Sequence, residues 1–348
     1  MFAVAGLVGC ADEEEPPDDT GATSSDTVGT SAASAVTTAQ PTTTEAPDPI
    51  TVAIVAPSGR DDASFTQSMV DSVERLAEDV PIELAISDGL ADIEAARTAL
   101  VQYATDGTDL VIAHGSQYGA AVREVAGAHP DVTFAWGTAD VSDGAPANVH
   151  GYTARSDEGG YVNGVLAAQL TTTGKVAVIA PVAVGDAARY VAGLVVGAAA
   201  VDPGVQIDAT YLDSYTDLGL AHEASATQIA AGADVLSGTA QIVNGARTPV
   251  LDAGLPWLAT QSSQNALGES VVASQVYHWE VAFADLVAQL STDGTAGVPP
   301  GPLPPLTLAN GGLTIEFNEE FPLDDAARAA ADEAIAGLTD GSVVTGVP

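Results

Sequence analysis

The chain has 348 residues, of which 46% are hydrophobic, and it carries nine Lys or Arg residues against 47 Asp or Glu residues. Its formal charge of −38 repels phosphate backbones and anionic lipid headgroups, so nucleic acid is excluded as an expected partner. The length exceeds the size at which one hydrophobic core keeps growing, and no apolar run reaches the roughly 20 residues of a membrane-spanning helix. Composition therefore predicts an acidic protein of two domains, or of one domain plus unfolded sequence, that does not cross a membrane.

The first ten residues are typical of the end of a bacterial export signal. Met1–Gly9 reads MFAVAGLVG, and Leu7-Val8-Gly9-Cys10 resembles a lipobox. We expect Cys10, the single cysteine, to be lipidated and to anchor the protein to the membrane at the cell surface or in the periplasm; the alternative is a chance cysteine. Residues 11–48 are acidic and then rich in Thr, Ser, Ala and Pro, which predicts a disordered tether because little apolar surface offsets the entropy of ordering.

From Ile50 onward, short apolar runs alternate with helical patterns. The first series places strands at Ile50–Ala56, Ile82–Ile86, Asp109–Ala113 and Val132–Trp136. In the first helix, Phe65, Met69, Val73 and Leu76 follow one another at spacings of four, four and three, which indicates a face packed on a core. Runs of β-branched residues separated by helices predict a parallel sheet that is covered on both faces.

A second series begins near Val149. Its expected strands are His150–Thr153, Lys175–Ala180, Val205–Leu212, Val235–Ser237, Trp257–Ala259 and Val271–Val276. Its expected helices are 156–172, Asp186–Ala200, Ala221–Ala231, Gln241–Ala253, His278–Leu290 and Asp324–Leu338, with a Pro-rich loop at 298–305 and a hairpin around Asn310–Gly312. Two similar series predict two lobes, residues 49–150 with 277–295 and residues 151–276 with 296–348, joined by three crossovers. Ligands of open α/β sheets bind beyond the carboxyl ends of the strands, so the facing strand ends are expected to form a cleft.

Several segments resemble, in order and spacing from about Ile50 to Val344, the basic membrane protein family of substrate-binding lipoproteins. The best-known members of that family are purine nucleoside receptors of ABC importers. The matching segments are Gly59–Gln67 (GRDDASFTQ, similar to G-x-x-D-x-S-F-N-Q), Arg155–Ala168 (similar to E-G-S/G-Y-L-x-G-x-L-A-A), Lys175–Val178, Gly193, Gly197, Asp213–Asp217 (similar to G-S-F-x-D), Gly232–Val235 (GADV) and Asn310–Gly312 (similar to D-G-G). The resemblance implies an α/β protein with the type I periplasmic-binding-protein fold, whose two Rossmann-like lobes close around a ligand.

The family pattern is altered at positions that contact ligand in the nucleoside receptors. The ribose-binding carboxylate after the fourth strand is replaced around Gly137-Thr138, and the D-S-D-Q segment reads Gln261–Gln264. Tyr277 stands where the family has a lysine, and Thr66 where it has an asparagine. Each buried partner left unpaired costs about 1–3 kcal/mol, so these replacements are enough to change the ligand. The expected ligand is an uncharged polar molecule with a flat ring, with a nucleoside or related heterocycle favoured.

The candidate ligand-binding residues share a place at predicted strand ends or helix starts. They are Asp62, Ser64, Phe65, Thr66, His114, Tyr118, Trp136, Gln241, Gln261 and Tyr277. Periodicity alone favours Phe65 as a core residue, whereas the resemblance implies that its ring stacks on a base. Trp136 is either a cleft wall or core, and His114 either a ligand contact or a satisfied loop donor.

Acidic residues near helix starts have a second interpretation, because the positive N-terminal end of a helix favours negative charge. Asp61 and Asp62 precede the first helix and are expected to cap it rather than contact ligand. Asp186 and Asp324 are expected to be caps as well.

Other functions have weaker support in the sequence. A G-x-S-x-G elbow, H-E-x-x-H, C-x-x-C and a P-loop are all missing, so we expect no enzyme activity, metal or cofactor. The expected role is an extracytoplasmic, monomeric solute-binding protein that delivers a small molecule to ABC permease subunits. The alternative is a ligand-sensing lipoprotein that presents its closed form to a signalling receptor, because closure rests on the same differential affinity.

Overall fold

The computed structural model describes residues 48–138, 141, 145–294, 299 and 301–348, all within one compact unit, Ala46–Pro348. Cys10 and residues 11–47 lie outside the described residues, so the lipobox and the tether remain predictions. Among the described residues, no helix combines the length and apolar character of a membrane-spanning segment.

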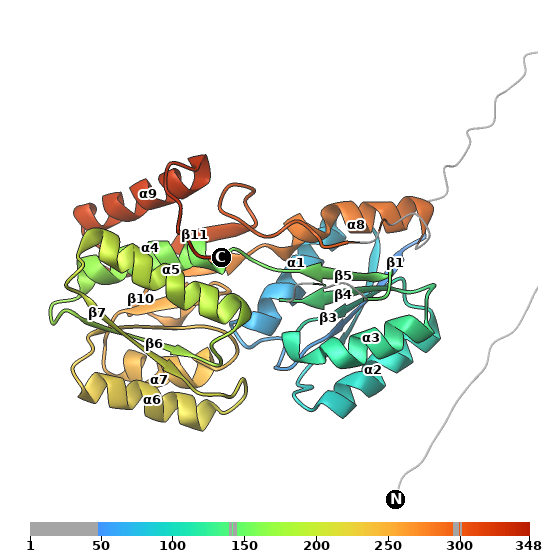
Figure 1. Ribbon diagram of the computed structural model, residues 1–348, viewed down its shortest axis with the longest axis horizontal. Helices are drawn as coiled ribbons and strands as arrows, with labels where there is room; N and C mark the ends of the chain where they lie inside the picture. The colour runs from blue at the N-terminus through green and yellow to red at the C-terminus, as the bar shows by residue number, and fades with distance from the viewer. Residues whose placement is uncertain (1–47, 139–140, 142–144, 295–298, 300) are drawn as a thin grey trace, which may run out of the picture. The chain divides into compact units, whose positions relative to one another are not determined.

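The first lobe is built on a parallel sheet that the described residues form in the order β2-β1-β3-β4-β5 (Figure 1). Its strands are β1 (Ile50–Val55), β2 (Ile82–Ser87), β3 (Leu110–Ala113), β4 (Thr133–Gly137) and β5 (Val149–Tyr152). Its helices are α1 (Phe65–Asp79), α2 (Ile93–Asp106), α3 (Gly119–Ala128), which follows the 3-10 turn η1 (Ser116–Tyr118), and α8 (Trp279–Asp293). Val52 and Ile54 face the core under α1 and α8, whereas Val55 faces α2 and α3, so alternation along β1 places helices on both faces.

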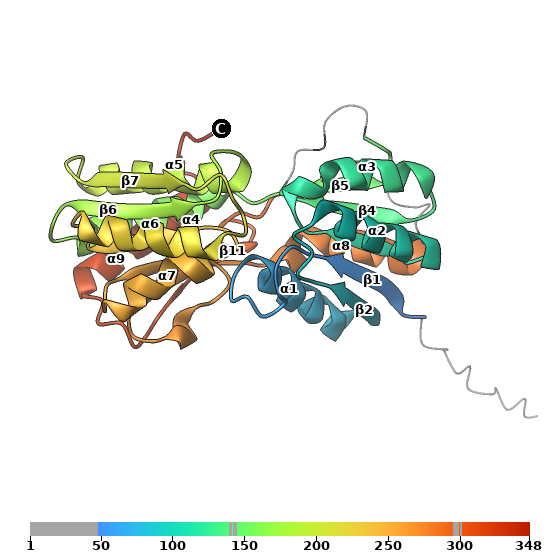
Figure 2. The same cartoon turned by 90° about the horizontal axis from the view of Figure 1, so that it is seen from below.

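The second lobe is built on a sheet that the described part of the chain forms in the order β11-β10-β9-β8-β6-β7, of which Figure 2 labels β6, β7 and β11. Its strands are β6 (Lys175–Ala180), β7 (Gln206–Tyr211), β8 (Val235–Gly238), β9 (Trp257–Gln261), β10 (Val271–Tyr277) and β11 (Leu313–Phe317). Its helices are α4 (Ser156–Leu170), α5 (Gly185–Val201), α6 (Leu218–Ala230), α7 (Val243–Asp252) and α9 (Asp325–Asp340), and the 3-10 turn η2 (Asn265–Leu267) joins β9 to β10. Helices α4, α5 and α9 cover one face and α6 and α7 the other, so the expected two-lobed α/β architecture is confirmed.

Three crossovers connect the lobes, as expected. The first runs from β5 to α4 and the second from β10 to α8. The third returns beside the first, where the Leu306 N–H donates to the Thr153 carbonyl at 3.0 Å and the Arg155 N–H donates to the Leu306 carbonyl at 2.8 Å. The first and third crossovers therefore form a short parallel ladder around the Ala154–Leu306 bridge.

Two expectations for local structure are wrong. The strand expected at His150–Thr153 as the start of the second lobe is β5, which pairs with β4 in the first sheet. The hairpin expected around Asn310–Gly312 is a turn that leads into β11, and β11 pairs antiparallel with β10, with Ile315 opposite Gln275. The Asn310 side chain closes that turn by accepting hydrogen bonds from the Thr307 and Gly312 N–H groups. The Asn-Gly pair therefore indicates a tight turn, but the strand after it pairs with β10 rather than with the segment just before the turn.

Glycines bring α4 and α5 into backbone contact. A Cβ atom added to Gly193 would lie 2.1 Å from the Asp157 carbonyl oxygen, and one added to Gly197 would lie 2.0 Å from that of Tyr161. On α4, a Cβ at Gly160 would lie 2.3 Å from the Tyr190 carbonyl oxygen. Only glycine fits such an approach, which places the start of α5 against the first crossover.

We expect Gly197→Ala to lower the free energy of unfolding by about 1–3 kcal/mol, because backbone atoms of α4 must move to admit the methyl group. Urea-induced unfolding measures the change. Gly127→Ala on α3 is the matched control: its methyl group would meet Pro146 at 3.9 Å, so helix propensity alone raises stability by about 0.5–1 kcal/mol. Equal stability of the two variants would contradict the packing argument.

Candidate ligand-binding site

A cavity of about 290 Å³ lies at the carboxyl ends of strands from both sheets. The first lobe contributes the segments that follow β3 and β4, and the second lobe those that follow β6, β7 and β8. The lining residues are Phe65, Gly115, Ser116, Gln117, Trp136, Thr138, Val184, Gly185, Asp186, Ala187, Tyr215, Thr239, Ala240, Gln241 and Gln261. The cleft expected from the facing strand ends therefore exists as a cavity of ligand size.

Aromatic rings from both lobes line the cavity. Phe65 begins α1, and one face of its ring stacks on the His114 imidazole with the ring centroids 3.8 Å apart. Trp136 lies near the end of β4, where its indole N–H donates to the Gly115 carbonyl at 3.1 Å. Tyr215 comes from the loop after β7. Flat apolar faces of this kind suit a planar ring.

His114 lies behind Phe65 rather than in the lining, and it is fully buried. Its Nε2 atom is 2.9 Å from the Phe65 carbonyl oxygen, which can only accept, so Nε2 carries the proton. Its Nδ1 atom therefore accepts from the Tyr152 hydroxyl, 2.7 Å away. Burial lowers the pKa of His114 to about 3, which keeps the imidazole neutral. Its position is that of a support for Phe65.

Ser64 joins the two lobes beside the cavity. Its hydroxyl donates to Oε1 of Gln261 at 3.0 Å and to the Ala240 carbonyl at 3.1 Å. In return, the Ser262 hydroxyl donates to the Ser64 carbonyl at 2.7 Å. These bonds hold the start of α1 against the end of β9, so Ser64 lies between the lobes while Gln261 lines the cavity.

Gln241 is a lining residue of which only 4% is exposed. A side-chain amide can donate and accept hydrogen bonds at the same time. The amide is therefore placed to recognise a polar ligand.

Strained backbone is concentrated around the cavity. Thr138, Ala240 and Gln261 line it with φ angles of 52°, 63° and 75°, a region that side chains other than glycine rarely adopt. Ala63, next to Ser64, has a φ of 49°. Such conformations cost about 1–3 kcal/mol each and tend to cluster at ligand sites, which supports a functional role for this cavity.

Besides His114 and Ser64, four of the predicted site residues lie outside the lining, and two of them, Asp62 and Thr66, lie near the start of α1. Asp62 takes the alternative role of a cap: its carboxylate accepts from the N–H groups of Ser64, Thr66 and Gln67 at 2.9, 3.2 and 3.1 Å. The Thr66 hydroxyl bonds to Ser58 at 2.7 Å. In this segment, Phe65 therefore lines the cavity, whereas Asp62 and Thr66 hold the start of α1.

Two tyrosines complete that set. The Tyr118 hydroxyl donates to the Leu90 carbonyl at 2.6 Å beneath α2. Tyr277 is 1% exposed, packs edge-on against Trp279 with the centroids 5.0 Å apart, and directs its hydroxyl towards Gln261 and Ser156. From the predicted set, Phe65, Trp136, Gln241 and Gln261 share the cavity lining.

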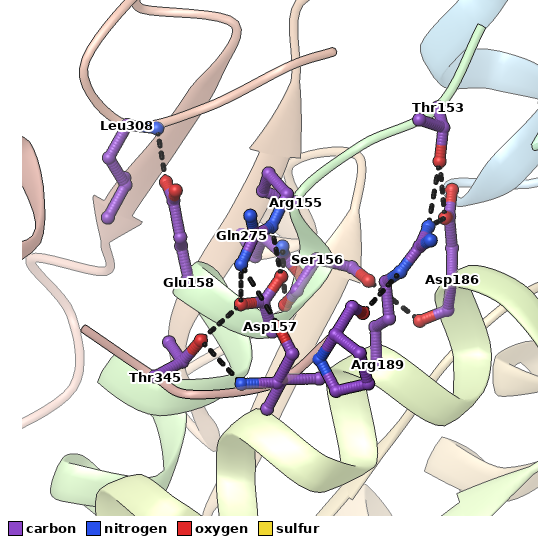
Figure 3. A network of polar contacts seen from close by, with 12 residues as sticks. Thr153, Arg155, Ser156, Asp157, Glu158, Asp186, Arg189, Gln275, Leu308 and Thr345 are labelled. Carbon is purple, nitrogen blue, oxygen red and sulfur yellow. Dashed lines mark hydrogen bonds and ion pairs between the residues drawn. The ribbon is translucent and has the colours of Figure 1, made fainter.

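Asp186 is a lining residue that sequence reasoning missed. The expectation that it caps a helix is wrong, because Val184 precedes α5 as its N-cap residue and the Asp186 carboxylate points to the first crossover. Oδ1 accepts from the Thr153 hydroxyl at 2.7 Å and from Nη1 of Arg189 at 3.1 Å (Figure 3). Burial raises the pKa of Asp186 to about 6 in spite of these donors. By contrast, Asp324 does cap α9, with its carboxylate 2.7 Å from the Ala327 nitrogen.

The crossover beside Asp186 is held by charged side chains and by the last residues of the chain. Arg155 pairs with the buried carboxylate of Asp157 at 2.7 Å, and the Thr345 hydroxyl donates to the same carboxylate (Figure 3). Nε of Arg189 donates to the Pro348 carbonyl at 3.2 Å. Among the described residues, no group of three or more His, Cys, Asp or Glu side chains is arranged to hold a metal.

A family model described as an ABC transporter substrate-binding protein, PnrA-like, matches residues 50–296. The chain belongs to the Bmp family. Basic membrane protein A of Borreliella burgdorferi is 30% identical over 175 residues, which are 48% of this chain and 49% of that protein. A purine-binding protein of Brucella abortus is 27% identical over 175 residues, which are 49% of this chain and 47% of that protein. The chain thus spans about half the length of the curated relatives it matches.

Solved structures of similar fold cover far more of the chain. An ABC transporter solute-binding protein from Conexibacter woesei is similar with a TM-score of 0.65 and 24% identity, over 85% of this chain and 98% of that protein. A solute-binding protein from Aeropyrum pernix reaches a TM-score of 0.72 at 17% identity, over 86% and 94% of the two chains. The resemblance to the basic membrane protein family and the type I periplasmic-binding-protein fold are both confirmed.

Proposed function

We propose that this Bmp family protein captures a small polar ligand in the cavity between its lobes and delivers it to the permease of an ABC importer. The observation that carries the proposal is the cavity itself, where aromatic rings from both lobes and buried amides from the second lobe meet at the strand ends. A site shared between lobes gives a ligand more contacts when the lobes are closed, which is the differential affinity that closure requires.

The lining favours an uncharged ligand with a flat ring, such as a nucleoside or a related heterocycle. Phe65, Trp136 and Tyr215 offer ring faces, and Gln241 and Gln261 offer amides that donate and accept. A purine-binding protein among the relatives supports the same class. Binding without chemical conversion is sufficient for this role.

The remaining parts of the proposal concern location and partners. The protein acts outside the cytoplasm as a monomer, anchored through lipid on Cys10, and its closed form docks on ABC permease subunits. The signalling alternative uses the same closed form but presents it to a receptor. Co-purification with permease subunits in the presence of ligand supports import, and co-purification with a sensor kinase instead supports signalling.

Thermal unfolding tests ligand capture. The chain is unfolded and refolded to remove carried ligand and is then heated in high salt with nucleosides, bases, sugars and amino acids. A ligand at 100 times its dissociation constant adds about 2.7 kcal/mol of stability if it binds only the folded state, so the midpoint rises. We expect a selective rise with nucleosides. A higher midpoint with another class of compound would assign the site to that class instead. If the midpoint rises with none of the compounds, the binding function is contradicted.

A further inference from the structure

Asp186 is the one carboxylate among the described residues that line the cavity, and no Lys, Arg or His lines it. The residue is 8% exposed, so its carboxylate has little access to water. A buried carboxylate needs hydrogen-bond donors to remain ionised. The hydrogen bonds that the protein donates to Asp186 therefore determine how many more the carboxylate can accept from a ligand.

The protein supplies fewer donors than the carboxylate can accept. Oδ1 receives the Thr153 hydroxyl at 2.7 Å and Nη1 of Arg189 at 3.1 Å. Among the described residues, Oδ2 receives only the Ala154 N–H, at a long 3.4 Å. Two carboxylate oxygens offer about four acceptor sites, so Oδ2 keeps capacity for another donor. The raised pKa agrees with this geometry, because burial outweighs the donors that are present.

Resting on the proposed function, we propose that Asp186 determines ligand specificity: its ionised carboxylate accepts N–H or O–H groups of the ligand, so the cavity selects donor-bearing molecules. A ligand donor completes the coordination of Oδ2. Because Thr153 and Ala154 belong to the first crossover, the same carboxylate joins the ligand to the segment about which the lobes close. Protonation of Asp186 removes an acceptor and competes with the ligand.

Other charged and titratable groups around Asp186 do not reproduce this effect. Arg189 on the same helix already donates to Oδ1, and burial raises the pKa values of Tyr152 and Tyr277 well above the ordinary value. At the start of α4, Arg155 pairs with Asp157, and Glu158 accepts the Leu308 N–H at 2.7 Å without lining the cavity. Tyr215 faces the cavity from the loop after β7. Glu158, a half-buried carboxylate whose pKa burial also raises, is a matched control for Asp186.

The experiment measures dissociation constants of adenosine and D-galactose for the full chain by calorimetry from pH 5 to pH 7.5. With a pKa of about 6 in the free protein, affinity is complete above pH 7 and falls tenfold for each pH unit well below 6. We expect affinity at pH 5 to be about tenfold weaker than at pH 7.5. Asp186→Asn should bind about tenfold or more weakly at pH 7.5 and should show no such pH dependence.

The Thr153→Val variant tests the role of Asp186 through the pH midpoint of ligand affinity, which a purely structural role of Asp186 would leave unchanged. Thr153 does not line the cavity, and losing its hydroxyl removes a donor from the ionised carboxylate. The midpoint of the affinity profile should therefore move to higher pH while the plateau is kept. Glu158→Gln should leave the profile unchanged.

The outcomes separate this inference from the proposed function. Binding at pH 7.5 with a flat profile, or a pH dependence that persists in Asp186→Asn or disappears in Glu158→Gln, overturns the role of Asp186 and leaves ligand capture standing. If neither probe binds, the proposed function fails for nucleosides and sugars, and the role of Asp186 fails with it. Far-ultraviolet circular dichroism of each variant shows that the fold is kept.

Discussion

Trp279→Ala is expected to lower the free energy of unfolding by about 3–5 kcal/mol, because it empties the aromatic core at the second crossover. Trp279 is fully buried, and its ring packs edge-on against Tyr152 and Tyr277 with centroids 5.1 and 5.0 Å apart. Its indole N–H donates to the Ser68 hydroxyl at 3.0 Å, and its backbone N–H donates to the Ser72 hydroxyl at 3.0 Å. The residue therefore fastens α8 to α1 where the chain re-enters the first lobe.

Denaturant unfolding followed by circular dichroism measures the loss. Trp279→Phe retains a ring and loses the indole N–H, so it should cost clearly less than the alanine variant. Trp136→Ala is the second control, since Trp136 is only partly buried and lies in the cavity lining. If Trp279→Ala and Trp136→Ala were equally stable, the second crossover would not depend on this core.

Phe65→Leu is expected to weaken adenosine binding by about 10- to 100-fold, because a leucine keeps apolar volume but loses the flat face. Stacking of a base on an aromatic side chain contributes about 1–3 kcal/mol, which corresponds to that range. One face of Phe65 is covered by His114, so only the remaining surface of the ring meets a ligand in the cavity. Calorimetric titration at pH 7.5, where Asp186 is ionised, measures the change.

Phe134→Leu is the matched control for this effect. Phe134 is a fully buried aromatic residue of β4 that faces the core under α2 and α3, away from the cavity lining. Both leucine variants lose a buried ring, but only Phe65→Leu should lose affinity. Equal affinities in the two variants would show that Phe65 acts as a core residue, the interpretation that helical periodicity alone favoured.

The course of the backbone follows closely from local patterns. Buried parallel strands need β-branched residues on both faces, so β1, β3 and β6 stand out as continuous apolar runs. The periodicity of α1 is equally clear, since Met69, Val73 and Leu76 are all buried. The pairing of strand β11 does not follow from local patterns. An Asn-Gly pair indicates only a turn, whereas β11 pairs with β10, whose residues lie about 40 positions away in the chain.

The candidate site was only partly predictable. Strand ends are visible in the sequence, which predicts Phe65, Trp136, Gln241 and Gln261 as candidates, and the structure places these four in the lining. The sequence predicts Asp186 to be a cap, because an acidic residue near a helix start is usually one. Its position over the first crossover depends on the glycine contact between α4 and α5. Its spacing of three from Arg189 was the only available signal, and it is common on helices.

The sequence by itself determined the fold class and the place of the cleft, because apolar periodicity and the alternation of strands with helices are properties of neighbouring residues. Its short motifs carried the resemblance to the family. Only the tertiary structure decided which polar side chains face that cleft. His114 and Tyr277 turn into the aromatic core. Asp186 turns to Thr153 across a crossover. The direction of a side chain depends on partners far away in the chain, and local pattern does not encode them.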